Sequence, residues 1–162
     1  MSILQVVDVA DLRISAQQED TIITYALGSC LGITIYDPEA RVGGMLHAML
    51  PQSTIDSKKA AENPFMFVDT GVPRLFHECY RIGAQKQRLV VKVAGGACAR
   101  GNEQDDYFQI GKRNMVMLRK LLWKNGVLLS SHDVGGSSPR TMSLDIETGD
   151  VWIKSSGSAR KL

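Results

Sequence analysis

The sequence has few cysteines and no long apolar segment. Its 162 residues include three cysteines, Cys30, Cys79 and Cys98, with no CxxC pair among them. An odd number of widely spaced cysteines argues against a disulfide framework and against a cysteine-based zinc site. We therefore expect free thiols and a cytoplasmic location. No apolar run approaches the roughly 20 residues that a spanning helix needs, and the N-terminus lacks a signal-peptide pattern, so membrane insertion is not expected.

The chain also lacks a large excess of charge of either sign. The formal net charge is +2, from 19 Lys and Arg against 17 Asp and Glu, which is too small to point to nucleic acid or an anionic membrane as a partner. No internal repeat, low-complexity tract or linker divides the chain. We therefore predict one domain over residues 1–162, with residues 155–162 as a flexible tail because they are short and polar.

Hydrophobic periodicity predicts several strands and two helices. The polar stretch 52–63 is expected to be a connection. Many strands in hairpin order with two helices between them indicate an α+β fold, in which the helices cover a mostly antiparallel or mixed sheet. Strands are predicted at 4–14 (one or two), 21–25, 30–36, 41–50, 89–94, 127–134, 141–146 and 151–154, and helices at 68–82 and 110–125.

The segment 24–51 contains a cysteine and a histidine on consecutive predicted strands. Asp37-Pro38-Glu39-Ala40 between them suits a type I turn, because proline pre-sets φ and aspartate accepts from the backbone of the turn. If Tyr36 faces Arg41 across this turn, counting six residues away from the turn along each strand sets Cys30 directly opposite His47. Their Cβ atoms would then lie about 4.5–5.5 Å apart. A bulge at Gly43-Gly44 would change this register.

A thiol beside an imidazole is a candidate catalytic pair. The imidazole can take the thiol proton, and the resulting thiolate attacks an acyl carbon. A turn at Gly28-Ser29-Cys30 can present backbone N–H groups to the oxyanion that forms. A second interpretation stands beside this one: Cys30 is a buried small hydrophobe and His47 a satisfied core residue.

No other constellation in the sequence predicts a cofactor or metal site. His77 and His132 stand far apart without acidic or sulfur ligands at usable spacing. The pairs Gly95-Gly96 and Gly135-Gly136 follow predicted strands, but neither forms a GxGxxG or Walker sequence. We therefore predict no cofactor and no metal.

The chain resembles the CheD family of chemoreceptor glutamine deamidases. The likeness runs from about residue 21 to residue 154, and the ordered set of motifs is more specific than any one of them. The matching segments are Leu27-Gly28-Ser29-Cys30, Tyr36-Asp37-Pro38, Gly43-Gly44-Met45 with His47, Met49-Leu50-Pro51, Lys92 to Ala97, Ile110 to Asn114, and Gly135-Gly136 through Thr148-Gly149.

The resemblance implies a fold, an activity and site residues. The expected fold is a layered α/β sandwich. The expected reaction is hydrolysis of the side-chain amide of selected glutamines in methyl-accepting chemotaxis receptors, giving glutamate and ammonia. The cysteine of the LGSC motif, here Cys30, is the implied nucleophile, and His47 is the implied base. Thr24, six residues before the cysteine, is implied to orient the imidazole.

The resemblance also implies a partner and shows one departure. Family members bind CheC, a phosphatase of the response regulator. Where the family usually has Gly-Arg after the second glycine pair, this chain has Pro139-Arg140, so contacts in that loop are expected to differ.

Two other functions compete with deamidation. A cysteine peptidase or a transglutaminase-like acyl transferase would use the same Cys–His pair. A non-catalytic adaptor would act mainly by binding CheC or receptors.

Overall fold

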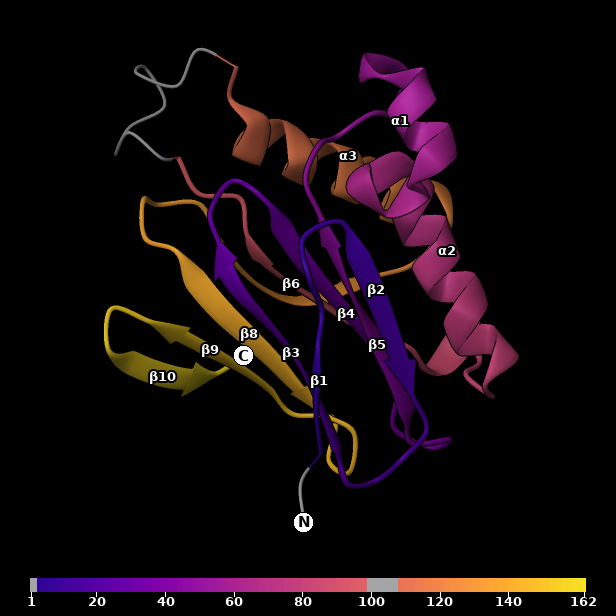
Figure 1. The fold of residues 1–162 in the computed structure, drawn as a ribbon. Coiled ribbons are helices and arrows are strands. Elements are labelled where there is room, and N and C mark those ends of the chain that lie inside the picture. The colour runs from indigo at the N-terminus through magenta and orange to yellow at the C-terminus, as the bar shows by residue number, and fades with distance from the viewer. Residues whose placement is uncertain (1–2, 99–107) are drawn as a thin grey trace.

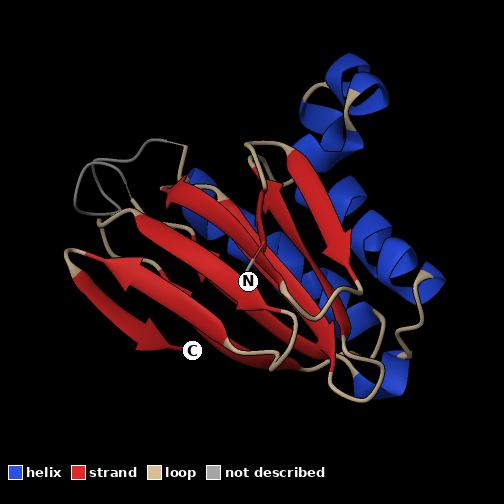
Figure 2. Ribbon diagram, turned by 60° about the horizontal axis from the view of Figure 1, so that its bottom comes forward, coloured by secondary structure: helices blue, strands red, loops and turns tan. Residues whose placement is uncertain are grey.

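Alternating apolar residues build two five-stranded sheets that pack face to face, and helices cover the outer face of one of them (Figures 1 and 2). The computed structural model describes residues 3–98 and 108–162. The elements are β1 (Ile3–Val6), β2 (Asp11–Ser15), β3 (Asp20–Leu27), β4 (Leu31–Asp37), β5 (Val42–Ala48), α1 (Ser57–Glu62), α2 (Val68–Arg81), β6 (Val90–Gly95), α3 (Ile110–Lys124), β7 (Leu129–Val134), β8 (Arg140–Asp145), β9 (Val151–Ser155) and β10 (Ser158–Lys161).

The strand order makes both sheets mixed. The first sheet runs β1-β3-β8-β9-β10 and the second β2-β5-β4-β6-β7. The pairs β1–β3 and β6–β7 are parallel, and the remaining pairs are antiparallel. The α+β prediction is confirmed, and α2 and α3 are the two main helices. The structure adds a second sheet, and it places the short helix α1 within the segment expected to be a connection.

Two apolar cores separate the three layers. Leu27 of β3, Met45 of β5 and Met142 of β8 belong to the core between the sheets. The second core lies between the second sheet and the helices, and it includes Ile33 of β4 and Leu118 of α3. Because side chains alternate along a strand, β4 and β5 contribute to both cores. A side chain on the inner face of the second sheet therefore meets the first sheet directly.

The predicted hairpin register is wrong by two positions. Gly32, not Cys30, lies opposite His47, and the pairing continues without a break to Asp37 opposite Val42. The loop is residues 38–41 because Arg41 takes a left-handed conformation (φ 55°) and donates its N–H to Asp37 O at 2.8 Å. A shift of two keeps the alternation of faces. Accordingly, Cys30 still packs against the core between the sheets, the side to which His47 points.

The segment expected to be a flexible tail is ordered as a strand. Ser156 and Gly157 take positive φ angles of 52° and 79°, the geometry of a tight hairpin turn. This turn folds β10 back onto β9. The last residue, Leu162, packs partly buried against the core between the sheets, and Lys92 Nζ donates to its main-chain oxygen at 2.9 Å. The polar composition of residues 155–162 led to the prediction of a flexible tail, although Ser156-Gly157 is a turn sequence.

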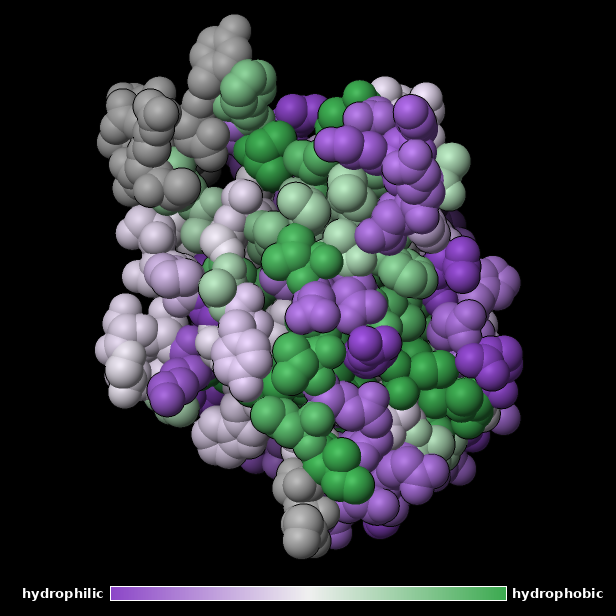
Figure 3. Space-filling model, viewed as in Figure 1, coloured by the Kyte–Doolittle hydropathy of each residue, from purple (hydrophilic) through white to green (hydrophobic). Residues whose placement is uncertain are grey.

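The outer face of the first sheet carries exposed apolar side chains. Figure 3 shows apolar surface along β1 and the segment that follows it: Ile3, Leu4 and Val6 of β1 and Val9 after it are between 39% and 54% exposed. Among the described residues, no helix covers this face (Figure 2). The helix layer therefore belongs to the second sheet.

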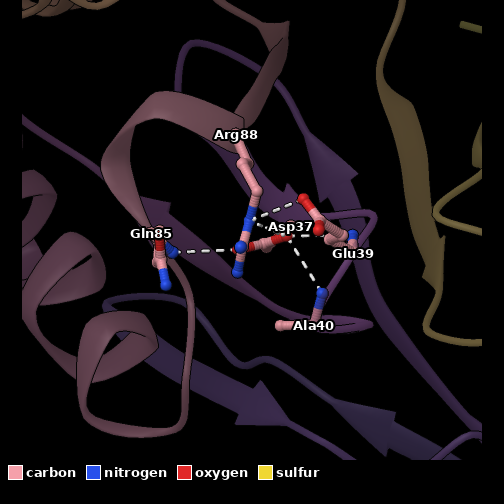
Figure 4. Close-up of polar contacts among 5 residues, drawn as sticks. All are labelled: Asp37, Glu39, Ala40, Gln85 and Arg88. Atoms are coloured by element: carbon pink, nitrogen blue, oxygen red, sulfur yellow. Dashed lines mark hydrogen bonds and ion pairs between the residues drawn. The ribbon is translucent and has the colours of Figure 1, made fainter.

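A buried carboxylate fixes the turn that sets the register of β4 and β5. Asp37 is fully buried, and Figure 4 shows its carboxylate between the turn and Arg88. It accepts from the N–H groups of Glu39 (2.9 Å), Ala40 (3.1 Å) and Gln85 (2.9 Å) and from Arg88 Nη2 at 2.8 Å. Burial raises the pKa of Asp37, but the hydrogen bonds from Arg88 and these N–H groups outweigh it and lower the pKa to about 2.

We predict that Asp37→Asn destabilises the protein by about 3 kcal/mol at pH 7, because one amide oxygen cannot replace a buried carboxylate that accepts from Arg88 and from three backbone N–H groups. The stabilisation from Asp37 is present above an ordinary carboxyl pKa of about 4 and is lost as the pH falls toward about 2. Urea unfolding between pH 7 and pH 2 measures this difference, which should shrink in acid. Glu39→Gln is the control: Glu39 pairs with the same Arg88 at 3.4 Å but is 74% exposed, so its loss should cost less than about 1 kcal/mol. Equal costs for the two changes would contradict the prediction.

Candidate active site

The three residues implied by the resemblance come from different parts of the fold. Thr24 lies in β3 of the first sheet, His47 in β5 of the second sheet, and Cys30 in the bend that connects β3 to β4. Thr24 and His47 are buried, with exposed fractions of 0% and 1%, and Cys30 is partly buried. The candidate site therefore lies between the two sheets, at the end where the chain crosses from one to the other.

A chain of hydrogen bonds fixes the histidine ring. Thr24 Oγ1 donates to Val7 O at 2.8 Å and lies 2.7 Å from His47 Nδ1. A hydroxyl has one hydrogen, and Val7 O can only accept. Thr24 must therefore accept from Nδ1–H, which assigns the neutral ring the tautomer with its lone pair on Nε2. Nε2 is the nitrogen that a general base would use.

Burial keeps the imidazole neutral. It lowers the pKa of His47, and the Asp11 carboxylate, on the residue opposite His47 in β2, partly offsets this by raising it. Nε2 is buried and has no hydrogen-bond partner among the described residues. A buried polar atom without a partner is costly and calls for an explanation. A proton-accepting role at this atom would supply one.

Cys30 is a protonated thiol at rest. Burial raises its pKa, and the hydrogen bond from its own backbone N–H opposes this. Because the pKa of His47 is lowered at the same time, a neutral thiol and a neutral imidazole are favoured near pH 7 over a thiolate and an imidazolium. Among the described residues, no hydrogen bond joins Cys30 Sγ to His47 Nε2. Chemistry at this site therefore requires proton transfer at the moment of attack.

The bend that carries Cys30 is held through its carbonyl oxygens. Ala97 N donates to Gly28 O at 2.8 Å, Asn114 Nδ2 to Ser29 O at 3.0 Å, and Gly96 N to Cys30 O at 3.0 Å. Three consecutive carbonyls thus point into the protein. Outside the contact of Cys30 N–H with its own thiol, no hydrogen bond between described residues uses the N–H of Ser29 or Cys30. The predicted supply of backbone donors from this turn is compatible with this geometry.

Two glycines allow the close approach of backbone around the site. A Cβ at Gly32, opposite His47, would lie 2.8 Å from Leu27 Cδ1 and 2.9 Å from Met142 Sδ, so a side chain there would displace these two core side chains of the first sheet. A Cβ at Gly95 would lie 2.1 Å from Cys30 O, and its φ of 111° disfavours any other residue. These glycines are therefore part of the framework of the site.

Sequence reasoning assigned no role to Asn114, although Asn114 ends one of the segments that carry the family resemblance. It lies in α3 and is fully buried, and its amide nitrogen also donates to Met49 O at 3.0 Å. A signal was present, because Asn114 is a polar residue four positions before Leu118 on the apolar face of the helix. A polar residue at a core position indicates a specific hydrogen bond.

The other two cysteines lie in α2 and after β6. Cys79 is fully buried in α2, and burial raises its pKa to about 12, with Glu78 adding to the shift. Cys98 is partly buried after β6, and its N–H donates to Gly136 O at 2.8 Å. No group of His, Cys, Asp and Glu within residues 3–98 and 108–162 is arranged to hold a metal ion. None of the helices in those ranges is long and apolar enough to span a membrane.

Residues 49–155 match a family model described as CheD chemotactic sensory transduction. The chain is 49% identical over 152 residues to the "Probable chemoreceptor glutamine deamidase CheD 1" of Syntrophus aciditrophicus, with 94% of both chains covered. It is 48% identical over 157 residues to the "Probable chemoreceptor glutamine deamidase CheD" of Solibacter usitatus, covering 97% of this chain and 92% of the relative.

A more distant relative carries the same name. The protein of Pyrococcus abyssi is 44% identical over 136 residues, covering 84% of this chain and 82% of its own. Among solved structures, a Neisseria meningitidis protein of the DUF152 family aligns with 82% of this chain and 63% of its own, at 10% identity and a TM-score of 0.48, a likeness too distant to bear on function. The family-model match begins after His47, whereas the alignments with the first two relatives extend into the N-terminal part.

We predict that Cys30 reacts with iodoacetamide as a thiol of raised pKa. The rate should rise with pH to a midpoint above the roughly 8.5 of a free cysteine, because burial disfavours the thiolate. Mass spectrometry of the peptide containing Cys30 distinguishes it from Cys79 and Cys98. Fast labelling that stays constant down to pH 5 would contradict the prediction, since it would indicate a preformed thiolate–imidazolium pair.

Proposed function

The chain belongs to the CheD family, and we propose that it hydrolyses the side-chain amide of glutamines in chemotaxis receptors, using Cys30 as nucleophile, His47 as base and Thr24 to orient the imidazole. The observation that carries this proposal is the fixed histidine. Its Nδ1 is held by Thr24 at 2.7 Å, and its Nε2 is buried without a partner among the described residues. Relatives that align with nearly the whole chain are named chemoreceptor glutamine deamidases.

The reaction begins with proton transfer from a neutral pair. As Cys30 Sγ attacks the carbon of the glutamine amide, His47 Nε2 takes the thiol proton, and the carbonyl oxygen becomes an oxyanion. The imidazolium then gives this proton to the amide nitrogen, which leaves as ammonia when the C–N bond breaks. The product of this half is a thioester between Cys30 and the substrate side chain.

Water completes the reaction. His47 Nε2 accepts a proton from a water molecule that attacks the thioester carbon, and the C–S bond breaks. The proton returns to the sulfur, which leaves a glutamate side chain and a free Cys30 thiol. Thr24 holds Nδ1–H throughout, so the same nitrogen serves as acceptor and donor in both halves.

Backbone N–H groups of the bend provide the oxyanion site in this proposal. The carbonyls of Gly28, Ser29 and Cys30 are bound by donors from other segments, which leaves the N–H side of the bend for the substrate. Fixed dipoles of this kind stabilise charge without reorganising during the reaction. Gly28 and Ser29 act here through their backbone.

The proposal also includes a binding partner, CheC, and a location, the cytoplasm. CheC is the partner that the family resemblance implies, and the cytoplasm is the compartment in which free thiols and receptor signalling domains would meet. Co-elution of the purified protein with CheC in size-exclusion chromatography tests the first point, and separate elution would contradict it.

We predict that Cys30→Ala abolishes ammonia release and the mass increase that marks conversion of receptor glutamines to glutamates. Cys98→Ala, which removes another partly buried thiol, is the control and should keep wild-type activity. Cleavage of the receptor chain or incorporation of an added amine would identify a peptidase or an acyl transferase instead. Full activity of Cys30→Ala would refute the catalytic proposal and favour the adaptor function.

We predict that Thr24→Val lowers kcat roughly tenfold to a hundredfold, because His47 Nδ1 loses the acceptor that sets its ring orientation. Valine keeps the shape of threonine, so the core between the sheets should remain packed. Thr24→Ser keeps the hydroxyl and should retain most of the activity. Equal losses in the two variants would show that the hydroxyl is not what matters.

A further inference from the structure

One buried amide joins the two segments that carry the proposed catalytic pair. Asn114 of α3 is 0% exposed. Its Nδ2 donates to Ser29 O, directly before Cys30, and to Met49 O, two residues after His47, both at 3.0 Å. These segments belong to different parts of the second sheet, since one precedes β4 and the other follows β5. The side chain therefore spans the base of the site.

The same turn of α3 presses against the rest of the nucleophile bend. Gly111 lies three residues before Asn114, hence on the same side of the helix. A Cβ at Gly111 would lie 2.6 Å from the carbonyl of Gly96, whose N–H holds Cys30 O. The helix backbone is thus in contact with the segment that fixes Cys30, and Asn114 extends this contact to the end of β5.

The chemistry of the amide suits this role better than a purely stabilising one. One nitrogen with two hydrogens and no charge can bridge two carbonyl oxygens, which a hydroxyl cannot do. The cost is visible at the other atom, because Asn114 Oδ1 is buried with no partner among the described residues. An apolar side chain at this core position would avoid that cost. The amide is therefore explained by what it holds together.

We propose that Asn114 is a positioning residue that fixes the Cys30 bend relative to the strand that carries His47. The inference rests on the proposed function, because it assigns Asn114 an effect on the reaction through Cys30 and His47. Without this bridge both segments keep their other bonds, such as Gly96 N to Cys30 O, but the distance between them is no longer set.

The first test separates rate from binding. Asn114→Leu should lower kcat about a hundredfold, as a shift of roughly 1 Å between reacting groups does, and leave KM within a few-fold of wild type, because Asn114 does not touch the substrate. Leu118→Ala is the matched control, since Leu118 is fully buried one turn further along α3. It should lower the melting temperature at least as much and keep kcat. Equal loss of kcat in both variants would overturn the proposal.

The second test uses a conservative variant. In Asn114→Asp an ionised carboxylate repels both carbonyls, whereas the protonated acid can donate to one of them. Burial raises the pKa of such a group. The kcat of Asn114→Asp relative to wild type should therefore increase as the pH falls from 7 to 5. A ratio that does not change with pH would count against the bridge.

The third test needs no receptor substrate. At pH 7, well below the midpoint for thiolate formation, the slow alkylation of Cys30 by iodoacetamide depends on proton transfer to the imidazole. Its rate should therefore fall in Asn114→Leu to the rate of His47→Ala, because in both variants the imidazole no longer assists the thiol. Wild-type alkylation in Asn114→Leu would overturn the positioning role even if deamidation holds. Failure of the proposed function gives a different result, namely full deamidase activity in Cys30→Ala.

Discussion

The contact between His47 Nδ1 and Thr24 Oγ1 is a hydrogen bond between the two sheets, and the candidate site depends on it. It requires the sheets to approach closely beside His47, which they do because Gly32 has no side chain to meet Leu27 and Met142. It also determines the chemistry of the ring: the hydroxyl is committed to Val7 O, so Nδ1 carries the hydrogen and Nε2 the lone pair. The close packing of the two sheets therefore also determines the tautomer of His47.

The proposed nucleophile, Cys30, is fixed by a different means. Cys30 lies in a bend outside any strand, and such segments are mobile unless their backbone groups are bound. Here the carbonyls on either side of the thiol are bound by Gly96 N and by Asn114 Nδ2. The scaffold therefore holds the bend from behind and leaves the thiol partly exposed. A glutamine side chain on another protein needs such an opening.

The sequence contained the local signals and lacked the long-range ones. Alternation along residues 30–36 and the spacing of apolar residues in 68–82 and 110–125 predicted strands and helices that the structure confirms. The register failed because it depends on how Arg41 closes a four-residue loop, which residue types do not specify. The error left the faces unchanged, since a shift of two preserves alternation. The contact of Thr24 with His47 joins strands from different sheets, so hairpin reasoning within one sheet had no access to it; only the family resemblance did.

The neutral resting state follows from where the pair is built. Burial raises the pKa of Cys30 and lowers that of His47, so each group resists the charge that the other would stabilise. A thiol in this state reacts slowly with passing electrophiles. In the proposed reaction, charge develops only when an amide carbon is in place to receive the sulfur and the backbone N–H groups of the bend face the new oxyanion. The same burial that slows the free thiol strengthens those hydrogen bonds once water is excluded. In the proposed reaction, selectivity for a positioned amide is therefore a consequence of placing Cys30 and His47 between the sheets.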